Sequence, residues 1–566
     1  MDFRHEIVRL LNKATKLDRD EVERLLAVPP DPKLGDYAFP CFKLGKNAKE
    51  EAELLRKKFP KTKLPKFVEK LETAGPYLNF YLKHSVIAEE TLSKIFKEKK
   101  NYGKQKIGNN KKIVIDFSSP NIAKPFGIGH LRSTVIGNSL YKTYHFLGYK
   151  PVGVNHLGDW GTQFGKLIVA YRKWGKEKEL EKDPIKYLLK LYVKFHDEAE
   201  KNEKFTEEAR EEFKKLENGD KKSLALWETF RELSLAEFQK VYQILDVGFD
   251  SYHGEAYYND KMEAAIDNLQ RKAPLTESEG ALVVDLEAYK MPPVLIKKSN
   301  GSTTYHTRDI AAASYRLKEY TPTKMLYVVG AEQKLHFKQL FKVLELAGMN
   351  KSEFIHVDFG LFKFPEGKMS TRKGNVIFLE EVLDKSIKLA EKIIEEKNPT
   401  LHNKSDVAKM VGIGAIIFAD LSNERTRNIN FDWERMLSFE GETAPYLQYT
   451  HARACSILRK VQKEYRQGPS AKINFESYSL PEEQALIKKL YEFPEIIVRV
   501  ADTYKPHHLA QYLIGLAQQF NEFYHKCPVI SGQDQQMKAR LLLVDSTRQV
   551  LENGLKLLGI KAPEEM

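Results

Sequence analysis

The stretch KIVIDFSSPNIAKPFGIGHLRST (residues 112–134) decides the fold of this chain. It opens on KIVIDF, a short run of β-branched and other apolar residues that is continuous rather than alternating. Strands that are buried on both faces of a parallel sheet have this composition. Two prolines and two glycines then break the run, and the helical pattern HLRSTVIGNSLYKTYHFLGY (130–149) follows. The stretch therefore predicts a strand, a tight turn and the helix of a βαβ unit.

Further runs of the same kind extend this pattern along the chain. They are continuous, rich in β-branched residues and separated by helical stretches, and they lie at KPVGVNHLGD (150–159), KMLYVVGAEQ (324–333) and FIHVDFGLF (354–362). Repeated βαβ units form a doubly wound parallel sheet, which binds ligands beyond the carboxyl ends of its strands. We therefore expect an α/β domain over residues 109–380. A charged stretch without strand signals, at about 170–245, is expected to be a helical insertion in it.

The two ends of the chain follow different patterns. Residues 1–108 combine helical patterns with the segments GDYAFPCF (35–42) and GPYLNFYL (75–82), which predicts a small N-terminal α/β domain. Residues 381–566 lack strand signals and contain long amphipathic patterns, so we expect a C-terminal helix bundle.

The composition indicates which partners the protein could bind and in which compartment it would be found. The 566 residues carry a formal net charge of +13 at pH 7, which favours a polyanion such as nucleic acid, although a lysine-rich solvated surface would give the same charge. No apolar run reaches about eighteen residues, and charges interrupt the N-terminal helical pattern, so we expect neither a membrane span nor a signal peptide. The three cysteines are too far apart for a metal site and favour a reducing, cytoplasmic location. Without a coiled-coil pattern, a monomer is expected.

The turn after the first strand offers the chemistry of a phosphate site. A helix that begins at His130 would point free N–H groups and its dipole toward a ligand above the sheet. The imidazole of His130 can donate to a phosphate oxygen, and Lys124 adds positive charge nearby. Gly127 and Gly129 would let a bulky ligand approach the backbone. The alternative is a tight strand-to-helix turn with a buried structural histidine.

A second candidate for phosphate binding is the loop FPEGKMSTRKGN (364–375), after the last strand. This glycine-containing segment has three basic residues that could bind polyphosphate, namely Lys368, Arg372 and Lys373. Basic glycine loops are common, so the segment is weak evidence by itself. Its combination with a glycine–histidine turn after the first strand is far more specific.

With this combination, the chain resembles the class I aminoacyl-tRNA synthetases and, among them, the arginyl-tRNA synthetase family. The resemblance covers nearly the whole chain and rests on SSPNIAKPFGIGHLRST (118–134), VNHLGDWGTQFGKL (154–167), YHTRDIAAA (305–313), VVGAEQKLHFKQL (328–340), KMSTRKGN (368–375) and YLQYTHAR (446–453). There are two departures. Gly127 stands where the HIGH signature of the family has its first histidine, and the KMSKS signature reads KMSTR. His156 is a candidate to compensate for the lost imidazole.

The resemblance implies ATP-dependent activation of L-arginine to arginyl-adenylate and transfer of arginine to the 3′-terminal ribose of tRNA(Arg). It implies a Rossmann-like catalytic domain, an N-terminal domain at the tRNA elbow and a C-terminal domain at the anticodon. Mg²⁺ is expected to accompany ATP, because it prefers phosphate and water to an all-protein cage. Activation is also expected to require bound tRNA. Because of Gly127, a catalytically impaired tRNA-binding paralogue is the alternative.

The charge of arginine indicates part of its pocket. A guanidinium is planar and always protonated, so its site needs carboxylates and other acceptors. Tyr305 and Asp309 are four residues apart and would share one face of a helix. The resemblance implies an arginine-binding set of Ser119, Asn121, Glu255, Tyr305, Asp309 and Gln333. Taken alone, Asp309 would more commonly form a salt bridge to Arg308 or a lysine.

The remaining roles also come from the resemblance. The catalytic set is Lys124, His130 and Lys368. The ATP-binding set is Gly127, Gly129, His130, Lys368, Met369, Ser370 and Arg372. The tRNA-binding set is Tyr77, Asn79, Tyr446, Tyr449, Arg453, Tyr524 and Met566. Tyrosines at helical spacing are often core residues, and that interpretation stays open for each of them.

Overall fold

The computed structural model describes residues 2–60, 64–363, 377–530 and 534–566. The chain forms two compact units, neither of which is continuous in sequence. One unit comprises Met1–Tyr102, Ala454–Phe493 and Gly515–Val550, and the other comprises Gly103–Arg453, Pro494–Ile514 and Leu551–Met566. The predicted domain boundaries after residues 108 and 380 stay predictions. No helix of the described residues is long and apolar enough to cross a membrane.

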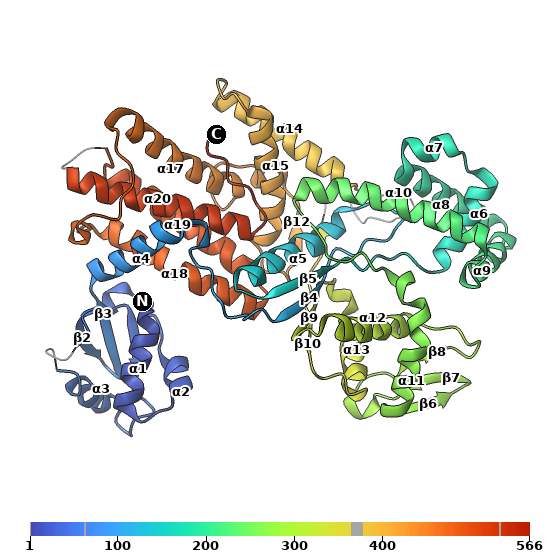
Figure 1. Cartoon of the computed structure of the whole chain (residues 1–566), viewed down its shortest axis with the longest axis horizontal. Coiled ribbons are helices and arrows are strands. Elements are labelled where there is room, and N and C mark those ends of the chain that lie inside the picture. Colours follow the sequence, from blue (N-terminus) through green and yellow to red (C-terminus); the bar gives the residue numbers. More distant parts are fainter. Residues whose placement is uncertain (1, 61–63, 364–376, 531–533) are drawn as a thin grey trace. The chain divides into compact units, whose positions relative to one another are not determined.

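A four-stranded parallel sheet organises the larger unit (Figure 1). Its strand order is β10–β9–β4–β5, and its members are β4 (Lys112–Asp116), β5 (Lys150–Val154), β9 (Lys324–Tyr327) and β10 (Glu353–His356). All neighbouring strands are parallel, and Val114 of β4 lies opposite both Val152 and Met325. The accompanying helices include α5 (Ile128–Phe146), α12 (Tyr305–Tyr320) and α13 (Lys334–Leu346). The predicted doubly wound α/β sheet is confirmed.

The turn between β4 and α5 has an unusual backbone. Ser118, Ser119 and Ala123 adopt φ values of 71°, 48° and 58°, in the left-handed region that is unfavourable for residues with a Cβ. Hydrogen bonds hold this conformation, since the Ser118 N–H donates to Oγ of Ser133 at 2.9 Å and the Ser118 hydroxyl lies 2.8 Å from the Tyr242 hydroxyl. Backbone strain of this kind persists only where the surrounding structure enforces it, and it is commonest at ligand sites.

Helix α5 begins earlier than predicted. Its first residue is Ile128 and its N-cap is Gly127, so His130 lies within the first turn rather than at the start. Gly127 has a φ of −82°, which any residue can adopt, so the backbone does not require glycine there. Glycine is required at Gly137, because a Cβ would come within 2.3 Å of the Phe117 side chain. This close approach packs α5 against the turn.

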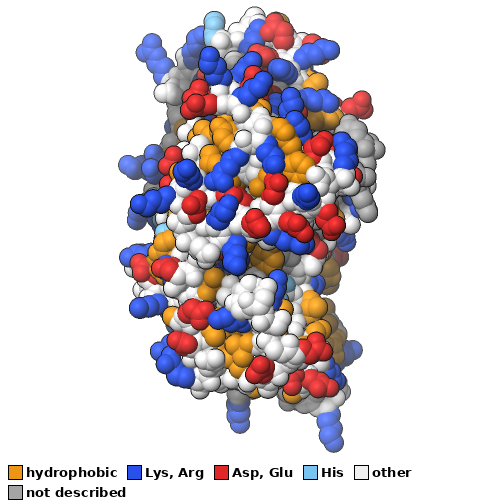
Figure 2. Space-filling model, turned by 90° about the vertical axis from the view of Figure 1, so that its right-hand side faces the viewer, with side chains coloured by type: hydrophobic (Ala, Val, Ile, Leu, Met, Phe, Trp, Pro, Cys, Tyr) orange, Lys and Arg blue, Asp and Glu red, His pale blue; other side chains and the backbone are white. Residues whose placement is uncertain are grey.

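The predicted helical insertion consists of helices. They are α6 (Thr162–Trp174), α7 (Glu177–Lys182), α8 (Pro184–Lys201), α9 (Lys204–Glu217) and α10 (Lys221–Leu245). Figure 2 shows the side of the molecule on which several of these helices lie, and there lysine and arginine side chains are interspersed with aspartate and glutamate. This face therefore has no single-sign patch, and the net positive charge is not concentrated on it.

A three-stranded antiparallel sheet was not predicted. It has the order β6–β7–β8, with β6 (Leu275–Ser278), β7 (Ala281–Val284) and β8 (Val294–Lys297), and α11 (Met262–Lys272) precedes it. The sheet supports the start of α12, because the Thr304 hydroxyl donates to the carbonyl of Leu295 at 2.6 Å. Thr304 and Thr307 also form a capping box at this helix start. The small sheet thus positions the helix that carries Tyr305 and Asp309.

The ends of the chain contain the predicted elements. The N-terminal residues form an antiparallel sheet of order β1–β3–β2, with β1 (Tyr37–Pro40), β2 (Val68–Ala74) and β3 (Tyr77–Leu82). Its helices are α1 (Phe3–Thr15), α2 (Arg19–Leu25), α3 (Ala48–Lys57) and α4 (His84–Glu98). The C-terminal helices are α14 (Leu379–Lys397), α15 (Lys404–Leu421), α16 (Trp433–Met436), α17 (Ala444–Tyr465), α18 (Pro481–Thr503), α19 (His507–Lys526) and α20 (Asp534–Leu557).

Candidate active site

His130 occupies the first turn of α5, where its backbone N–H donates to the Gly127 carbonyl at 2.9 Å. Burial, with a smaller contribution from the charge of Lys124, lowers the pKa of the His130 imidazole to about 4. The ring is therefore neutral at pH 7 and can act as a hydrogen-bond donor without carrying charge. Its Nδ1 atom is buried without a partner among the described residues. A Cβ on the neighbouring Gly129 would meet nothing within 4 Å, so the backbone at Gly129 is open to an approaching ligand.

Lys124 belongs to the same turn, and its side chain contacts helices of the insertion. Its Nζ atom donates to Oε1 of Gln163 at 3.0 Å and lies 5.7 Å from the ring centre of Tyr192. The positive charge is thus held by side chains of α6 and α8. Four predicted site residues, Lys368, Met369, Ser370 and Arg372, lie outside the described residues.

The predicted guanidinium-binding residue Asp309 is surrounded by histidines. Its Oδ2 lies 2.7 Å from Nε2 of His336, and its Oδ1 lies 3.9 Å from Nε2 of His156. Burial by itself would raise the pKa of Asp309, but the hydrogen bond from His336 and the nearby His156 and His306 hold that pKa below its usual range. Asp309 is therefore ionised at neutral pH. Its partners among the described residues are histidines rather than Arg308 or a lysine, and His156 lies beside this predicted arginine-binding residue.

Glu255 is the second carboxylate of the predicted arginine-binding set. Its Oε2 lies 3.5 Å from a guanidinium nitrogen of Arg308, so Arg308 pairs with Glu255 and not with its neighbour Asp309. Burial raises the pKa of Glu255 to about 8, against the opposing effect of Arg308. The carboxyl group is mostly protonated at pH 7, and a further cation beside it would favour its ionised form.

The other predicted arginine-binding residues differ in exposure. The Ser119 hydroxyl donates to Oδ1 of Asp116 at 3.0 Å, at the end of β4. Tyr305 is 67% exposed at the first position of α12, and that segment is helical, so Tyr305 and Asp309 share a face as expected. Gln333 is exposed in a short 3-10 helix directly before α13. Ser119 and Gln333 thus follow the carboxyl ends of β4 and β9, and Tyr305 lies at the start of α12.

The loop after β5 connects the strained turn to the carboxylate pocket. Gly158 forms a bridge with Asn121, and a Cβ on Gly158 would come within 2.2 Å of the Asn121 Oδ1 atom. The carbonyl of Leu157 accepts the N–H of Glu255 at 2.9 Å. His156 of the same loop faces Asp309. One short loop therefore brings both halves of the predicted site together.

Predicted tRNA-binding residues of the larger unit gather near the C-terminus. Arg453 lies over the ring of Tyr449, with 4.8 Å between the guanidinium carbon and the ring centre, and Tyr449 is 40% exposed. The ring of Phe439 lies 6.4 Å from that of Tyr449 and packs on the same apolar cluster as Met566. Tyr446 precedes them on α17 and is partly buried. This arrangement gives a basic and aromatic surface.

In the other unit, the predicted tRNA-binding residues differ in how far they are exposed. Tyr77 is 40% exposed on β3, with its ring edge 5.8 Å from that of Phe42. Asn79 is only 2% exposed, so its amide is enclosed in the domain and does not fit direct contact with a base. Tyr524 is partly exposed on α19, stacked on Phe520.

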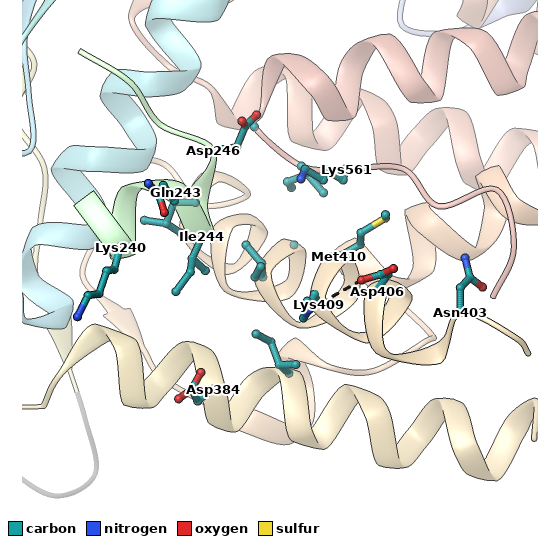
Figure 3. A pocket seen from close by; sticks show the side chains of 16 residues that line it. Lys240, Gln243, Ile244, Asp246, Asp384, Asn403, Asp406, Lys409, Met410 and Lys561 are labelled. Atoms are coloured by element: carbon teal, nitrogen blue, oxygen red, sulfur yellow. Dashed lines mark ion pairs between the residues drawn. The ribbon is translucent and has the colours of Figure 1, made fainter. Parts of the chain in front are cut away.

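A cavity of about 660 Å³ in the larger unit lies between α10, α14, α15 and the C-terminal segment (Figure 3). None of the predicted site residues lines it. Its lysines and aspartates are equal in number, namely Lys240, Lys409, Lys561, Asp246, Asp384 and Asp406. It therefore has no excess charge that would favour a polyanion, and it is separate from the site above.

Comparison with known proteins agrees with this geometry. Residues 91–433 match the catalytic domain of the class I (R) tRNA synthetases, residues 1–82 the arginyl-tRNA synthetase N-terminal domain, and residues 447–566 the DALR anticodon-binding domain. The chain is 49% identical to the arginine–tRNA ligase of Clostridium botulinum and 48% identical to that of Clostridioides difficile, with 100% of each chain covered. The arginyl-tRNA synthetase structure from Thermus thermophilus superimposes with a TM-score of 0.83, at 27% identity and 100% coverage of both chains. That from Plasmodium falciparum gives 0.81, at 25% identity and 99% coverage of both.

The parallel sheet, its strained strand-to-helix turn and the matching catalytic domain define an aminoacyl-tRNA ligase of class I. Within that class, the chain belongs to the arginyl-tRNA synthetase family. The prediction of this family from the sequence is confirmed, and nothing in the comparisons supports the impaired paralogue.

Proposed function

We propose that this chain activates L-arginine with ATP and transfers it to the 3′-terminal ribose of tRNA(Arg). In the first step, a carboxylate oxygen of arginine attacks the α-phosphorus of ATP, forming arginyl-adenylate and releasing pyrophosphate. In the second step, a ribose hydroxyl attacks the carbonyl carbon and AMP leaves. The observation that carries the proposal is the loop after β5, which joins the His130 turn to the pocket of Asp309 and Glu255.

In the activation step, His130 and Lys124 would act on the phosphates. A neutral imidazole donor placed where negative charge grows stabilises the transition state without repelling other cations. Lys124, together with Lys368 of the second signature, would supply positive charge. No group of three or more His, Cys, Asp or Glu among the described residues could hold a metal ion. Mg²⁺ would bind through ATP and water, because it prefers phosphate and water as ligands, and would neutralise phosphate charge there.

The carboxylate pocket would bind the guanidinium of arginine. Asp309 is ionised in the free protein, and Glu255 would ionise as the guanidinium arrives. The pocket would be completed by side chains of the turn, Ser119 and Asn121, and of two helix starts, Tyr305 and Gln333. A neutral analogue would leave an ionised carboxylate unpaired, which explains strong discrimination in sites of this type.

Arginine binding is expected to release a proton at pH 7 and almost none at pH 9. With a pKa of about 8, Glu255 is roughly nine-tenths protonated at pH 7 and roughly one-tenth at pH 9. Binding should therefore tighten as the pH rises toward 8. Calorimetry with tRNA present, in buffers of different ionisation enthalpy, measures the released proton. Glu255→Gln is the control and should abolish the difference; equal release at both pH values would contradict the prediction.

The basic and aromatic surface of α17 would bind the anticodon loop, with exposed bases stacked on tyrosine. Tyr449→Ala is expected to raise the KM for tRNA about five- to hundredfold, because stacking on one aromatic ring contributes about 1–3 kcal/mol. Tyr465→Ala is the matched control, since Tyr465 is an equally exposed tyrosine at the end of the same helix. Aminoacylation kinetics measure both values, and equal values for the two variants would remove Tyr449 from the interface.

The test of the whole proposal is arginine-dependent exchange of pyrophosphate into ATP, with and without unfractionated tRNA, against the other amino acids. Exchange with arginine, and only when tRNA is present, is the expected result. No exchange with any amino acid, in a protein that binds tRNA, would refute the catalytic proposal.

The chain is also proposed to act as a cytoplasmic monomer. Its three cysteines are all buried thiols, which suits a reducing compartment.

A further inference from the structure

His336 contacts the carboxylate on which the proposed arginine pocket depends, and its role was not predicted from the sequence. It lies in the first turn of α13, and its Nε2 atom is 2.7 Å from Oδ2 of Asp309 on α12. The other oxygen, Oδ1, lies 3.9 Å from Nε2 of His156, which is beyond hydrogen-bond distance. One oxygen of Asp309 is therefore bound within the protein, and the other is directed elsewhere.

Two aromatic rings pack close to His336. The ring of His306 lies 4.3 Å away and that of Phe337 lies 5.4 Å away, edge-on. Burial, and then the proximity of His336, lowers the pKa of His306 to about 4, so His306 is neutral at pH 7. His306 therefore packs against His336 without adding a charge at pH 7, and its effect on the pKa of Asp309 is smaller than those of His336 and His156.

We propose that His336 is a positioning residue for the substrate guanidinium. By donating from Nε2 to Oδ2, it fixes the plane of the Asp309 carboxylate and leaves Oδ1 for the substrate. This inference rests on the proposed function. A guanidinium donates through a rigid planar fork, so its affinity depends on the orientation of the acceptor as well as on its charge. A carboxylate that rotates freely would have to be ordered at each binding event.

A positioning role and a purely structural role of His336 predict different kinetic effects. His336 acts through Asp309, so its loss should weaken arginine binding and leave ATP binding and the rate at saturating arginine nearly unchanged. It should also weaken arginine more than citrulline, whose neutral urea group cannot form a charged pair with Asp309. A residue that only stabilised the fold would affect both ligands and both KM values alike.

The experiment compares three variants in tRNA-dependent exchange of pyrophosphate into ATP. His336→Ala is expected to raise the KM for arginine about ten- to hundredfold, the usual effect of losing a hydrogen bond to a charged group. His336→Gln places an amide donor near the position of Nε2 and should stay within about fivefold of the unaltered protein. His306→Ala removes a neighbouring ring without removing the donor and should stay within about threefold. Competition by citrulline against arginine is measured for all of them.

Three results would overturn the inference. The first is an unchanged KM for arginine in His336→Ala, and the second is an equal loss in His336→Gln and His336→Ala. The third is an equal increase in the KM values of ATP and arginine, which would indicate a merely structural role. Failure of the proposed function is distinguishable, because the unaltered protein would then show no arginine-dependent exchange at all.

Discussion

Replacing Asp309 with alanine is expected to abolish measurable use of arginine while tRNA binding survives. Asp309 is ionised in the free protein, because His336 and the neighbouring histidines hold its pKa below the usual range against the effect of burial. Without it, the substrate guanidinium would lose its ionised partner in an enclosed site. Breaking a buried charge pair costs about 3–5 kcal/mol, which corresponds to a loss of roughly a hundred- to several-thousandfold in kcat/KM.

Asp260→Ala is the matched control for this prediction. Asp260 is a well-exposed carboxylate that pairs with Lys261 at 2.6 Å, and no role in the pocket is assigned to it. Steady-state exchange kinetics and a direct tRNA-binding measurement should show a large loss of arginine use for Asp309→Ala and no change for the control. An unchanged kcat/KM in Asp309→Ala would remove this residue from the pocket.

Replacing His130 with alanine is expected to slow adenylate formation about a hundred- to thousandfold, the typical effect of losing one transition-state donor. His130 is the one imidazole of this signature, because Gly127 stands in place of the other. The KM for arginine should hardly change, since His130 is not among the residues proposed to bind the guanidinium. With a pKa of about 4, His130 should add no titration to the rate between about pH 6 and 8.

His145→Ala serves as the control for His130, because His145 is an exposed histidine in the last turn of the same helix. Single-turnover formation of arginyl-adenylate, with saturating ATP, arginine and tRNA, measures the chemical step. If His130→Ala stays within about threefold of the unaltered protein, the imidazole supports the turn rather than the phosphates. That outcome would favour the structural interpretation of this histidine.

The sequence predicted the sheet well because buried parallel strands have a local signature. Each strand of the sheet falls at or within one residue of a continuous apolar run, and helical stretches separate the strands. Boundaries were less accurate. Helix α5 begins at Ile128, because Gly127 takes the extended conformation of an N-cap, and sequence spacing does not determine that conformation.

The strands β6 to β8 were missed for the opposite reason. Each has only four residues, and many of their side chains are partly or fully exposed. β6 (LTES) has no apolar run, and the runs in β7 (ALVV) and β8 (VLI) are too short to distinguish a strand from other structure. Their importance is also non-local, because β8 supports the start of α12 through Thr304. Similarly, the low exposure of Asn79 follows from packing within its own sheet and not from its neighbours in sequence.

By itself, the sequence determined the fold class, the family and the residue types of the pocket, because these depend on local patterns and on the charge of the ligand. Only the tertiary structure decided which groups pair. Asp309 contacts His336, which is 27 positions away, and Glu255 contacts Arg308, which is 53 positions away. Burial at these contacts then set the protonation states, with Glu255 mostly neutral and Asp309 ionised at pH 7. Such pairings arise when separate elements pack together, and burial changes the free energy of a charge according to everything that surrounds it.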